Sequence, residues 1–135
     1  MVFLVDVLEH LSAKDAAETL RAVVTALRPG GQLVLRTPNA NSSFASRYRY
    51  IDATHERSYT EVSLRSHLLA IGFVDIAIKA DDVWAVRSAL GAVRVALKVV
   101  SRWARRISAV GEFGPEGLRM PLSLNLLATA RKPTA

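Results

Sequence analysis

The pattern of apolar and polar residues along the first third of the chain predicts a strand, a helix and a second strand. Continuous apolar runs at 2–7 and 32–37 are typical of strands that are buried on both faces. Between them lies an amphipathic helical pattern that Ser12 is suited to cap and that the Pro-Gly-Gly turn at 29–31 ends. These short connections predict a parallel, right-handed βαβ unit.

The remaining pattern adds a long polar segment, a helix and two further strands. Residues 38–59 are polar and aromatic without a period, which predicts a long ordered loop of the kind that usually serves a function. Thr60 opens a helix that Gly72 ends, the alternating segment 73–80 predicts a strand near the sheet edge, and 122–131 predict a last strand. The fold is therefore α/β, with too few helices to cover both faces of its sheet.

Between these last two strands, residues 83–110 form a long helical pattern without an acid. Its cations fall on one face, and they are Arg87, Arg94, Lys98, Arg102 and Arg105. Its apolar face consists of Val86, Leu90, Val93, Leu97, Val100 and Ile107. Such a helix is typical of a membrane-surface segment, a lid over an acidic ligand or a partner-binding helix. The plain alternative is an insertion that packs on the sheet and exposes its basic face.

Composition narrows the class of protein. With 135 residues, half of them apolar and 22% charged, the chain is expected to form a single globular domain. It has no cysteine, which excludes disulfides and thiolate metal sites and suits the cytoplasm. No stretch reaches the roughly 18 uninterrupted apolar residues of a membrane span. The net charge of +6 favours acidic partners, but only Trp84 and Trp103 interleave with the basic residues of 83–110, which argues against nucleic acid.

The densest group of chemically active residues is the segment Asp-Val-Leu-Glu-His, residues 6–10, directly after the first predicted strand. Ligands of open α/β sheets bind beyond the carboxyl ends of the strands, so this position favours a functional site. The alternative is a helix start, with Asp6 as N-cap and Glu9 completing a capping box. The two interpretations are compatible, and both stay open at the level of sequence.

A second group, Thr-His-Glu-Arg-Ser-Tyr at 54–59, lies in the long polar segment. A neutral histidine such as His55 can take a proton from an acceptor hydroxyl or amine near pH 7. The alternative is that His55 fastens its own loop and that Arg57 pairs with Glu56 or Asp52. Polar loop residues beside strand ends are where active sites commonly lie, which favours function.

The two groups together contain a mixed oxygen and nitrogen donor set. Asp6, Glu9, His10 and His55 would suit a divalent ion such as Mg, Mn or Zn if the fold brings them together. A metal is the less favoured interpretation, because the spacing alone does not make these residues neighbours. The third histidine, His67, has apolar helical neighbours and is expected to be structural.

Three segments, taken in order, resemble the C-terminal half of class I S-adenosylmethionine-dependent methyltransferases. They are VFLVDVLEHL, LRPGGQLVLRTPN and DATHERSYTEVSLRSHLLAIGF. They are similar to the fourth strand with its turn, to the Pro-Gly-Gly turn with the fifth strand, and to a D-x-T-H-x-R-x-[FY]-[ST] segment. The branch with this last segment includes many enzymes that act on small molecules, quinones and glycans. LLATARK resembles the antiparallel last strand of that fold.

The resemblance implies a Rossmann-like sheet with a basic helical insertion. Residues 1–135 would form one partial methyltransferase domain, with the βαβ part at 1–82, the insertion at 83–117 and the last strand and tail at 118–135. The implied roles are cofactor contact for Asp6, Val7 and Leu8, acceptor contact for Glu9, Arg57 and Tyr59, and proton removal for His10 and His55. The cofactor would be S-adenosylmethionine, and the acceptor a small molecule, a lipid-linked compound or a glycan methylated on O or N.

The chain departs from the family in lacking the Gly-rich loop and the acidic residue that hold the cofactor. Its seven glycines include no G-x-G-x-G. We therefore expect an incomplete chain that is inactive alone. The alternative is a non-catalytic binding module, or a protein that binds a membrane surface or a partner through 83–110. The expected location is the cytoplasm, with peripheral membrane contact through that helix.

Overall fold

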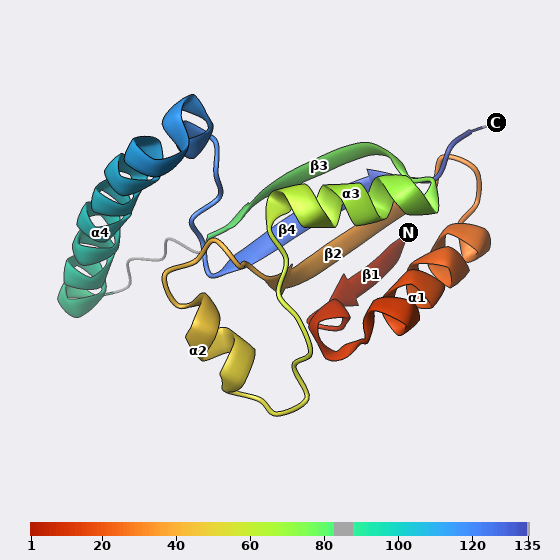
Figure 1. The fold of residues 1–135 in the computed structure, drawn as a ribbon, viewed down its shortest axis with the longest axis horizontal. Helices are drawn as coiled ribbons and strands as arrows, with labels where there is room; N and C mark the ends of the chain where they lie inside the picture. The colour runs from red at the N-terminus through yellow and green to blue at the C-terminus, as the bar shows by residue number, and fades with distance from the viewer. Residues whose placement is uncertain (83–87, 135) are drawn as a thin grey trace.

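The computed structural model describes residues 1–82 and 88–134, which form a four-stranded mixed sheet with helices (Figure 1). The strands are β1 (Val2–Val5), β2 (Gln32–Pro38), β3 (Val74–Asp81) and β4 (Asn125–Arg131). Their order is β1-β2-β4-β3; β1 and β2 are parallel, and β4 is antiparallel to both of its neighbours. This confirms the α/β prediction, the antiparallel last strand and the position of β3 at the sheet edge.

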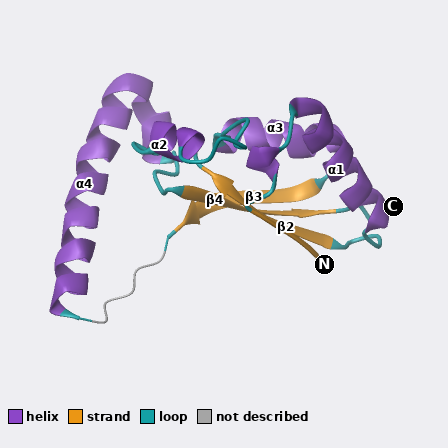
Figure 2. Cartoon of the chain, turned by 90° about the horizontal axis from the view of Figure 1, so that it is seen from below, coloured by secondary structure: helices purple, strands orange, loops and turns teal. Residues whose placement is uncertain are grey.

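Two helices, α1 (Ala13–Ala26) and α3 (Glu61–Ile71), lie on the same face of the sheet (Figure 2). Ser12 caps α1 by accepting from the Asp15 N–H, and Thr60 caps α3 in a reciprocal capping box, as their side-chain chemistry predicts. Gly72 ends α3 with a φ of 100°, a conformation that costs glycine little. The core under these helices includes Leu20, Leu33, Leu35, Leu64, Leu68, Phe73 and Leu126.

The opposite face of the sheet carries no helix in the described part of the chain (Figure 2). Val2 and Leu4 of β1 pack against the core, whereas Phe3 and Val5 point the other way and are 62% and 50% exposed. Within the described residues, β1 also pairs on one side only, with β2. The prediction that the first strand is buried on both faces is therefore wrong, whereas the predicted shortage of covering helices is present in the structure.

The segment 38–59 differs from the predicted loop because it contains a short helix, α2 (Ala45–Tyr50). β1 is also shorter than predicted, since Asp6 leaves the strand with a φ of 53° and starts a 3-10 turn, η1 (Leu8–His10). The interpretation of Asp6 as an N-cap is wrong, because Val7 holds that position and no side chain caps η1.

The predicted basic helix is present as α4 (Ala89–Phe113), followed by the 3-10 helix η2 (Gly114–Leu118). Val86 and Arg87 lie outside the described residues. The plain alternative of a solvated basic face is wrong, because it is the apolar residues of α4 that face outward. Six of them are between 55% and 73% exposed, namely Leu90, Val93, Leu97, Val100, Trp103 and Ile107.

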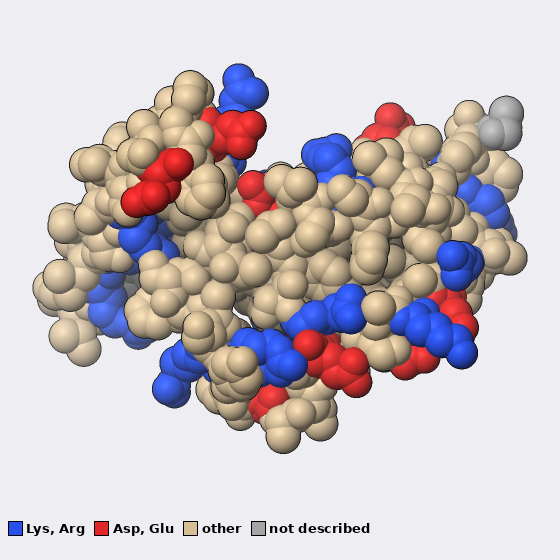
Figure 3. Space-filling model, viewed as in Figure 1, with Lys and Arg blue, Asp and Glu red and all other residues tan. Residues whose placement is uncertain are grey.

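Neutral atoms form the outer edge of α4, at the left of the space-filling view (Figure 3). Two side chains of the basic face, Arg102 and Lys98, turn inward instead and contact Asp82, which directly follows β3. Even with this apolar surface, no helix in residues 1–82 and 88–134 is long and apolar enough to cross a membrane.

Candidate functional site

The two predicted groups of active residues meet at the carboxyl end of β1. Here the main chain of η1 is joined to the segment after α2: the Glu9 carbonyl accepts from the Glu56 N–H at 2.7 Å and from the Arg57 N–H at 3.3 Å. The carboxyl ends of β1 and β2 point toward α2 and α4 (Figure 1). The site therefore lies where open α/β sheets bind their ligands.

Glu9 lies at the bottom of this site with 1% of its surface exposed. Its carboxylate Oε2 accepts a hydrogen bond of 3.1 Å from the Thr37 hydroxyl, and Thr37 is itself buried near the end of β2. Burial raises the pKa of Glu9, because the charged form loses its hydration; the negative charge of Asp6 adds to this rise, while hydrogen bonds oppose it.

His10 is held through a chain of hydrogen bonds that fixes its tautomer. Its Nδ1 lies 2.8 Å from the Thr54 hydroxyl oxygen, and that hydroxyl donates its proton to the Asp52 carboxylate at 2.7 Å. Because a carboxylate only accepts, the Thr54 oxygen is left to accept from His10, which places the proton on Nδ1. The Nε2 lone pair of His10 is then available as a base. The hydrogen bonds from Thr54 hold the pKa of Asp52 below its usual value.

His55 is fixed in the same way by a main-chain carbonyl. Its Nδ1 lies 2.7 Å from the Tyr48 carbonyl oxygen, which only accepts, so Nδ1 carries the proton and Nε2 the lone pair. The Arg49 guanidinium in turn donates to the His55 carbonyl. His55 therefore does fasten its own loop, and this bond also presents its ring edge-on to His10, with the ring centroids 4.6 Å apart.

Glu9, His10 and His55 each place one potential ligand atom within 4.8 Å of the others. Two imidazoles and one carboxylate form a donor set used for divalent transition metals, and each Nδ1–H bond resembles the outer support that metal-binding histidines usually have. Asp6 does not belong to this group, because its carboxylate pairs with Arg36 at 3.0 Å. Three of the four residues in the predicted donor set are thus brought together.

The three residues predicted to contact a cofactor directly follow β1, and they differ in how deeply their side chains are buried. Asp6 is partly exposed beside Arg36, Val7 is half-buried, and Leu8 is in the hydrophobic core with 1% exposure. The side chain of Leu8 is therefore committed to packing. Cofactor contact at this position would fall to the main chain and to the flanking residues.

The other residues predicted to contact an acceptor lie beside Glu9. Arg57 is half-buried and is tied by its N–H to the Glu9 carbonyl. Tyr59 is only 3% exposed, burial raises the pKa of its hydroxyl, and its ring lies 5.8 Å from that of His67. These positions place Tyr59 in the wall of the site rather than at its surface, and His67 in the packing that supports it.

Three residues have supporting roles that the sequence analysis did not assign. Thr37 was not singled out, Asp52 was considered only as a partner of Arg57, and Thr54 was noted only as the first residue of the second group. Thr37 is a polar residue at the end of a buried strand, a position that signals a polar partner in the core. Asp52 accepts from the Thr54 N–H at 2.8 Å, a local turn for which the Asp-x-Thr spacing is a recognisable signal. The contact between Thr54 and His10, across 44 residues, has no signal in the sequence.

The buried carboxyl of Glu9 gives a prediction about stability. Since its pKa is raised on folding, its contribution is fully present below about pH 4.5 and is lost as the pH rises through the folded value. Glu9→Gln keeps an oxygen that accepts from Thr37 and removes the charge. We expect urea unfolding, followed by circular dichroism, to show the variant gaining stability relative to the wild type between about pH 4.5 and 7.

The matched control is Glu18→Gln on α1. The Glu18 carboxylate is exposed, and its Oε1 lies 3.9 Å from the Lys14 Nζ. An exposed pair of this kind contributes little, so the difference from the wild type should stay small at every pH. A stability difference for Glu9→Gln that does not change with pH would contradict the buried-carboxylate interpretation.

Comparison with known proteins identifies the family of this chain and solved structures with a similar fold. A family model described as a methyltransferase domain matches residues 1–78. A search of curated proteins gave no match. Among solved structures, an S-adenosylmethionine-dependent methyltransferase from Archaeoglobus fulgidus is 19% identical with a TM-score of 0.61, and the similarity covers 97% of this chain and 58% of that one.

Two further structures share the fold at lower identity. Phosphoethanolamine N-methyltransferase 2 from Haemonchus contortus, solved with phosphomonomethylethanolamine and S-adenosylhomocysteine, is 15% identical with a TM-score of 0.54, covering 98% of this chain and 33% of that one. The small RNA methyltransferase HEN1 is 13% identical with a TM-score of 0.56, covering 96% and 13%. The chain thus spans 58% of the first structure and less of the others. Because the family model matches more than half of the chain, the protein belongs to the methyltransferase domain family, and its fold matches part of the fold of a solved S-adenosylmethionine-dependent methyltransferase.

Proposed function

We propose that this chain supplies the acceptor side of an S-adenosylmethionine-dependent methyltransferase that methylates an oxygen or nitrogen atom. The observation that carries the proposal is the pair of imidazoles His10 and His55, which cluster with buried Glu9 and each have the Nδ1 atom engaged, so that the Nε2 atom keeps a lone pair. This pair lies at the strand ends of a methyltransferase-family fold. The proposed acceptor is a small molecule, a lipid-linked compound or a glycan.

The residues of the site are suited to position an acceptor and to remove its proton. S-adenosylmethionine, when bound, supplies an electrophilic methyl group. The Nε2 atom of His10 or His55 would accept the proton that the acceptor hydroxyl or amine loses. For His10, the Asp52 carboxylate would stabilise the resulting imidazolium through Thr54, while Glu9 and Arg57 would orient the acceptor.

The described residues fit the cofactor on one side only. The main chain of residues 6–8 turns away from β1 with Asp6 at positive φ, and it would form one wall of the cofactor site. No glycine precedes Gly30, so no Gly-rich turn accompanies β1 within residues 1–29. We infer that further polypeptide covers the exposed Phe3 and Val5 and completes the cofactor side.

A second role for the same site is a divalent metal held by Glu9, His10 and His55. It is favoured by one observation, the 4.8 Å clustering of their ligand atoms. A metal there would grip acceptor oxygens rather than accept a proton. The base and metal roles differ in their response to chelators, which the experiments below use.

We also infer that the protein acts in the cytoplasm and touches membranes peripherally. The support is the exposed apolar row of α4, because an apolar helix face of this kind can lie in a membrane interface. A non-catalytic binding module that uses this same helix is the alternative class of function.

Transfer of labelled methyl groups tests the proposal. The longest natural polypeptide that contains these 135 residues would be incubated with S-adenosylmethionine labelled in its methyl group and with separate lipid, glycan and small-molecule extracts of the source cells. We expect label in one extract and release of S-adenosylhomocysteine. A polypeptide that binds S-adenosylmethionine but transfers label to none of the extracts would favour the binding-module alternative.

A further inference from the structure

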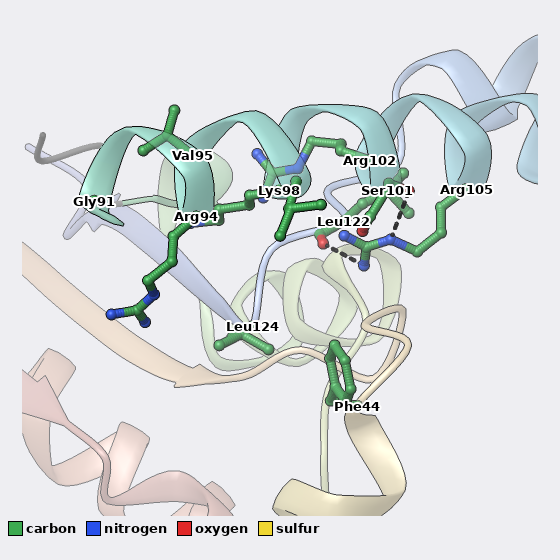
Figure 4. Close-up of a pocket in the computed structure, with 11 residues that line it drawn as sticks. Phe44, Gly91, Arg94, Val95, Lys98, Ser101, Arg102, Arg105, Leu122 and Leu124 are labelled. Atoms are coloured by element: carbon green, nitrogen blue, oxygen red, sulfur yellow. Dashed lines mark hydrogen bonds between the residues drawn. The ribbon is translucent and has the colours of Figure 1, made fainter. Parts of the chain in front are cut away.

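A pocket of about 670 Å³ lies between α4 and the ends of the strands, apart from the histidine pair (Figure 4). One wall is the inner face of α4, and the opposite side is formed by Phe44, at the start of α2, and by Leu122 and Leu124, before β4. The walls therefore combine a cationic helix with an apolar floor, which suits a ligand that has both a charged and an apolar part.

The helix wall brings four cations to this pocket, namely Arg94, Lys98, Arg102 and Arg105. The acidic residue next to them, Asp82, is already paired with two of these cations. Arg102 donates to both of its oxygens, one at 2.7 Å, and Lys98 lies 3.4 Å away. These contacts hold the pKa of Asp82 below its usual value. No acidic residue lines the described pocket wall, so positive charge is in excess there.

Arg94 and Arg105 differ in how their guanidinium groups are held. Arg105 donates to the Leu122 carbonyl and to the Ser43 hydroxyl, and burial together with the Arg102 charge lowers the pKa of its guanidinium. Among the described residues, Arg94 has no side-chain partner, and its guanidinium extends from α4 clear of the other labelled side chains (Figure 4). An anion that enters the pocket could therefore accept hydrogen bonds from the N–H groups of the Arg94 guanidinium.

The pocket is connected to the histidine pair through one short stretch of chain. Ser43, which contacts Arg105, and Phe44 lie at one end of α2, and Tyr48, which holds His55, lies near the other end. α2 and α4 both lie toward the carboxyl ends of the parallel strands (Figure 1). A molecule bound in the pocket would therefore extend along the same edge of the sheet as the proposed proton acceptors.

We propose that the pocket between α4 and the strand ends binds a phosphate group of the methyl acceptor, with Arg94 and Lys98 as its main contacts. The identification of the bound molecule as the acceptor rests on the proposed methyltransferase function, but the anion site itself does not. Arginine forks match phosphate geometry, and the apolar floor formed by Phe44, Leu122 and Leu124 would take the remainder of the molecule.

Binding of inorganic phosphate to the 135-residue chain, measured by calorimetry, tests the site without any methyl transfer. Arg94→Gln is the informative variant, because the wild-type side chain has no partner among the described residues whose loss would disturb the fold. We expect it to weaken phosphate binding about tenfold or more, as removal of a charge-assisted contact does. Arg94→Lys should restore part of the affinity.

The matched control is Arg21→Gln, which removes the same charge from the exposed side of α1. It should leave phosphate binding unchanged. Equal phosphate affinities of the wild type and Arg94→Gln, or no phosphate binding by either, would overturn the proposal. Because neither measurement uses S-adenosylmethionine, failure here is distinguishable from failure of the methyl-transfer proposal.

Sedimentation with phosphatidylglycerol vesicles separates the two sources of such a phosphate. Vesicle binding that inorganic phosphate displaces and that Arg94→Gln weakens would support a lipid headgroup as the bound group. Phosphate binding without vesicle binding would support a soluble phosphorylated acceptor. Vesicle binding that is unaffected by Arg94→Gln, in a chain that binds no phosphate, would assign the contact to the outer apolar face of α4 and overturn the pocket proposal.

Discussion

Methyl transfer is expected to fall by about a hundredfold or more when either His10 or His55 is replaced by alanine in the active protein. Each imidazole has its Nδ1 proton committed, His10 to Thr54 and His55 to the Tyr48 carbonyl, so each presents one basic nitrogen to the site. Removal of the base that serves the acceptor leaves water to take the proton. The measurement is kcat for label transfer from S-adenosylmethionine, with binding of the cofactor measured separately.

The matched control for these variants is His67→Gln. His67 lies on α3, and among the described residues its ring contact is with Tyr59 and not with either histidine of the pair, so the rate should stay near that of the wild type. If His55→Ala leaves the rate unchanged, His55 has no catalytic role, and the same holds for His10. If both variants keep the wild-type rate, the pair acts only in fastening the loop.

The response to a chelator distinguishes a base from a metal ligand in the same assay. We expect the wild type to keep its rate in EDTA if the histidines act as bases. A rate that EDTA abolishes and Mn²⁺ restores, with Glu9→Gln as impaired as the histidine variants, would instead support the metal role of the Glu9, His10 and His55 cluster.

Binding of S-adenosylmethionine should be weak for residues 1–135 alone and at least about a hundredfold tighter for a longer natural polypeptide that adds a Gly-rich strand-turn-helix beside β1. The shorter chain would lack two or more charge-assisted or main-chain hydrogen bonds to the cofactor, and this loss is enough to weaken binding about a hundredfold. The structural basis is the exposed Phe3 and Val5 and the unpaired side of β1 within the described residues. Isothermal calorimetry measures both proteins under the same conditions.

Circular dichroism is the necessary control, because a chain with a bare sheet face could fail to bind simply by failing to fold. A folded 135-residue chain that binds S-adenosylmethionine with a micromolar Kd would contradict the inference that its cofactor side is incomplete. A longer polypeptide that binds no more tightly would contradict it as well, since the added segment would then not form the missing wall.

Much of the fold could be predicted from residue order. The positions of β1 and β2, the caps at Ser12 and Thr60, and the αL glycine at Gly72 each depend on a few residues, and the structure confirms them. The burial of β1 on both faces is not confirmed, because burial depends on which elements cover the sheet. Local chemistry of this kind is written in the sequence because the partners are neighbours in the chain. α2 was missed because six residues are too few to show a helical period.

The candidate site was located by sequence, but its connections were not. Residues 6–10 and 54–59 were both singled out, yet whether Glu9 caps a helix or lies under two histidines depends on packing. In the structure Glu9 is a buried acceptor for Thr37, Asp6 turns away to Arg36, and Thr54 reaches His10. These contacts join residues 28 or more positions apart, and no local pattern specifies them.

The helix α4 separates the two kinds of information most clearly. The sequence by itself determined that this segment is a helix with a basic face and an apolar face, because both follow from a period of 3.6 residues. Only the tertiary structure decided which face turns inward. Asp82 at the end of β3 and the carbonyl of Leu122 draw the arginines toward the sheet, and the apolar row is left outside. That orientation depends on partners far along the chain, and it makes the basic face of α4 one wall of the pocket.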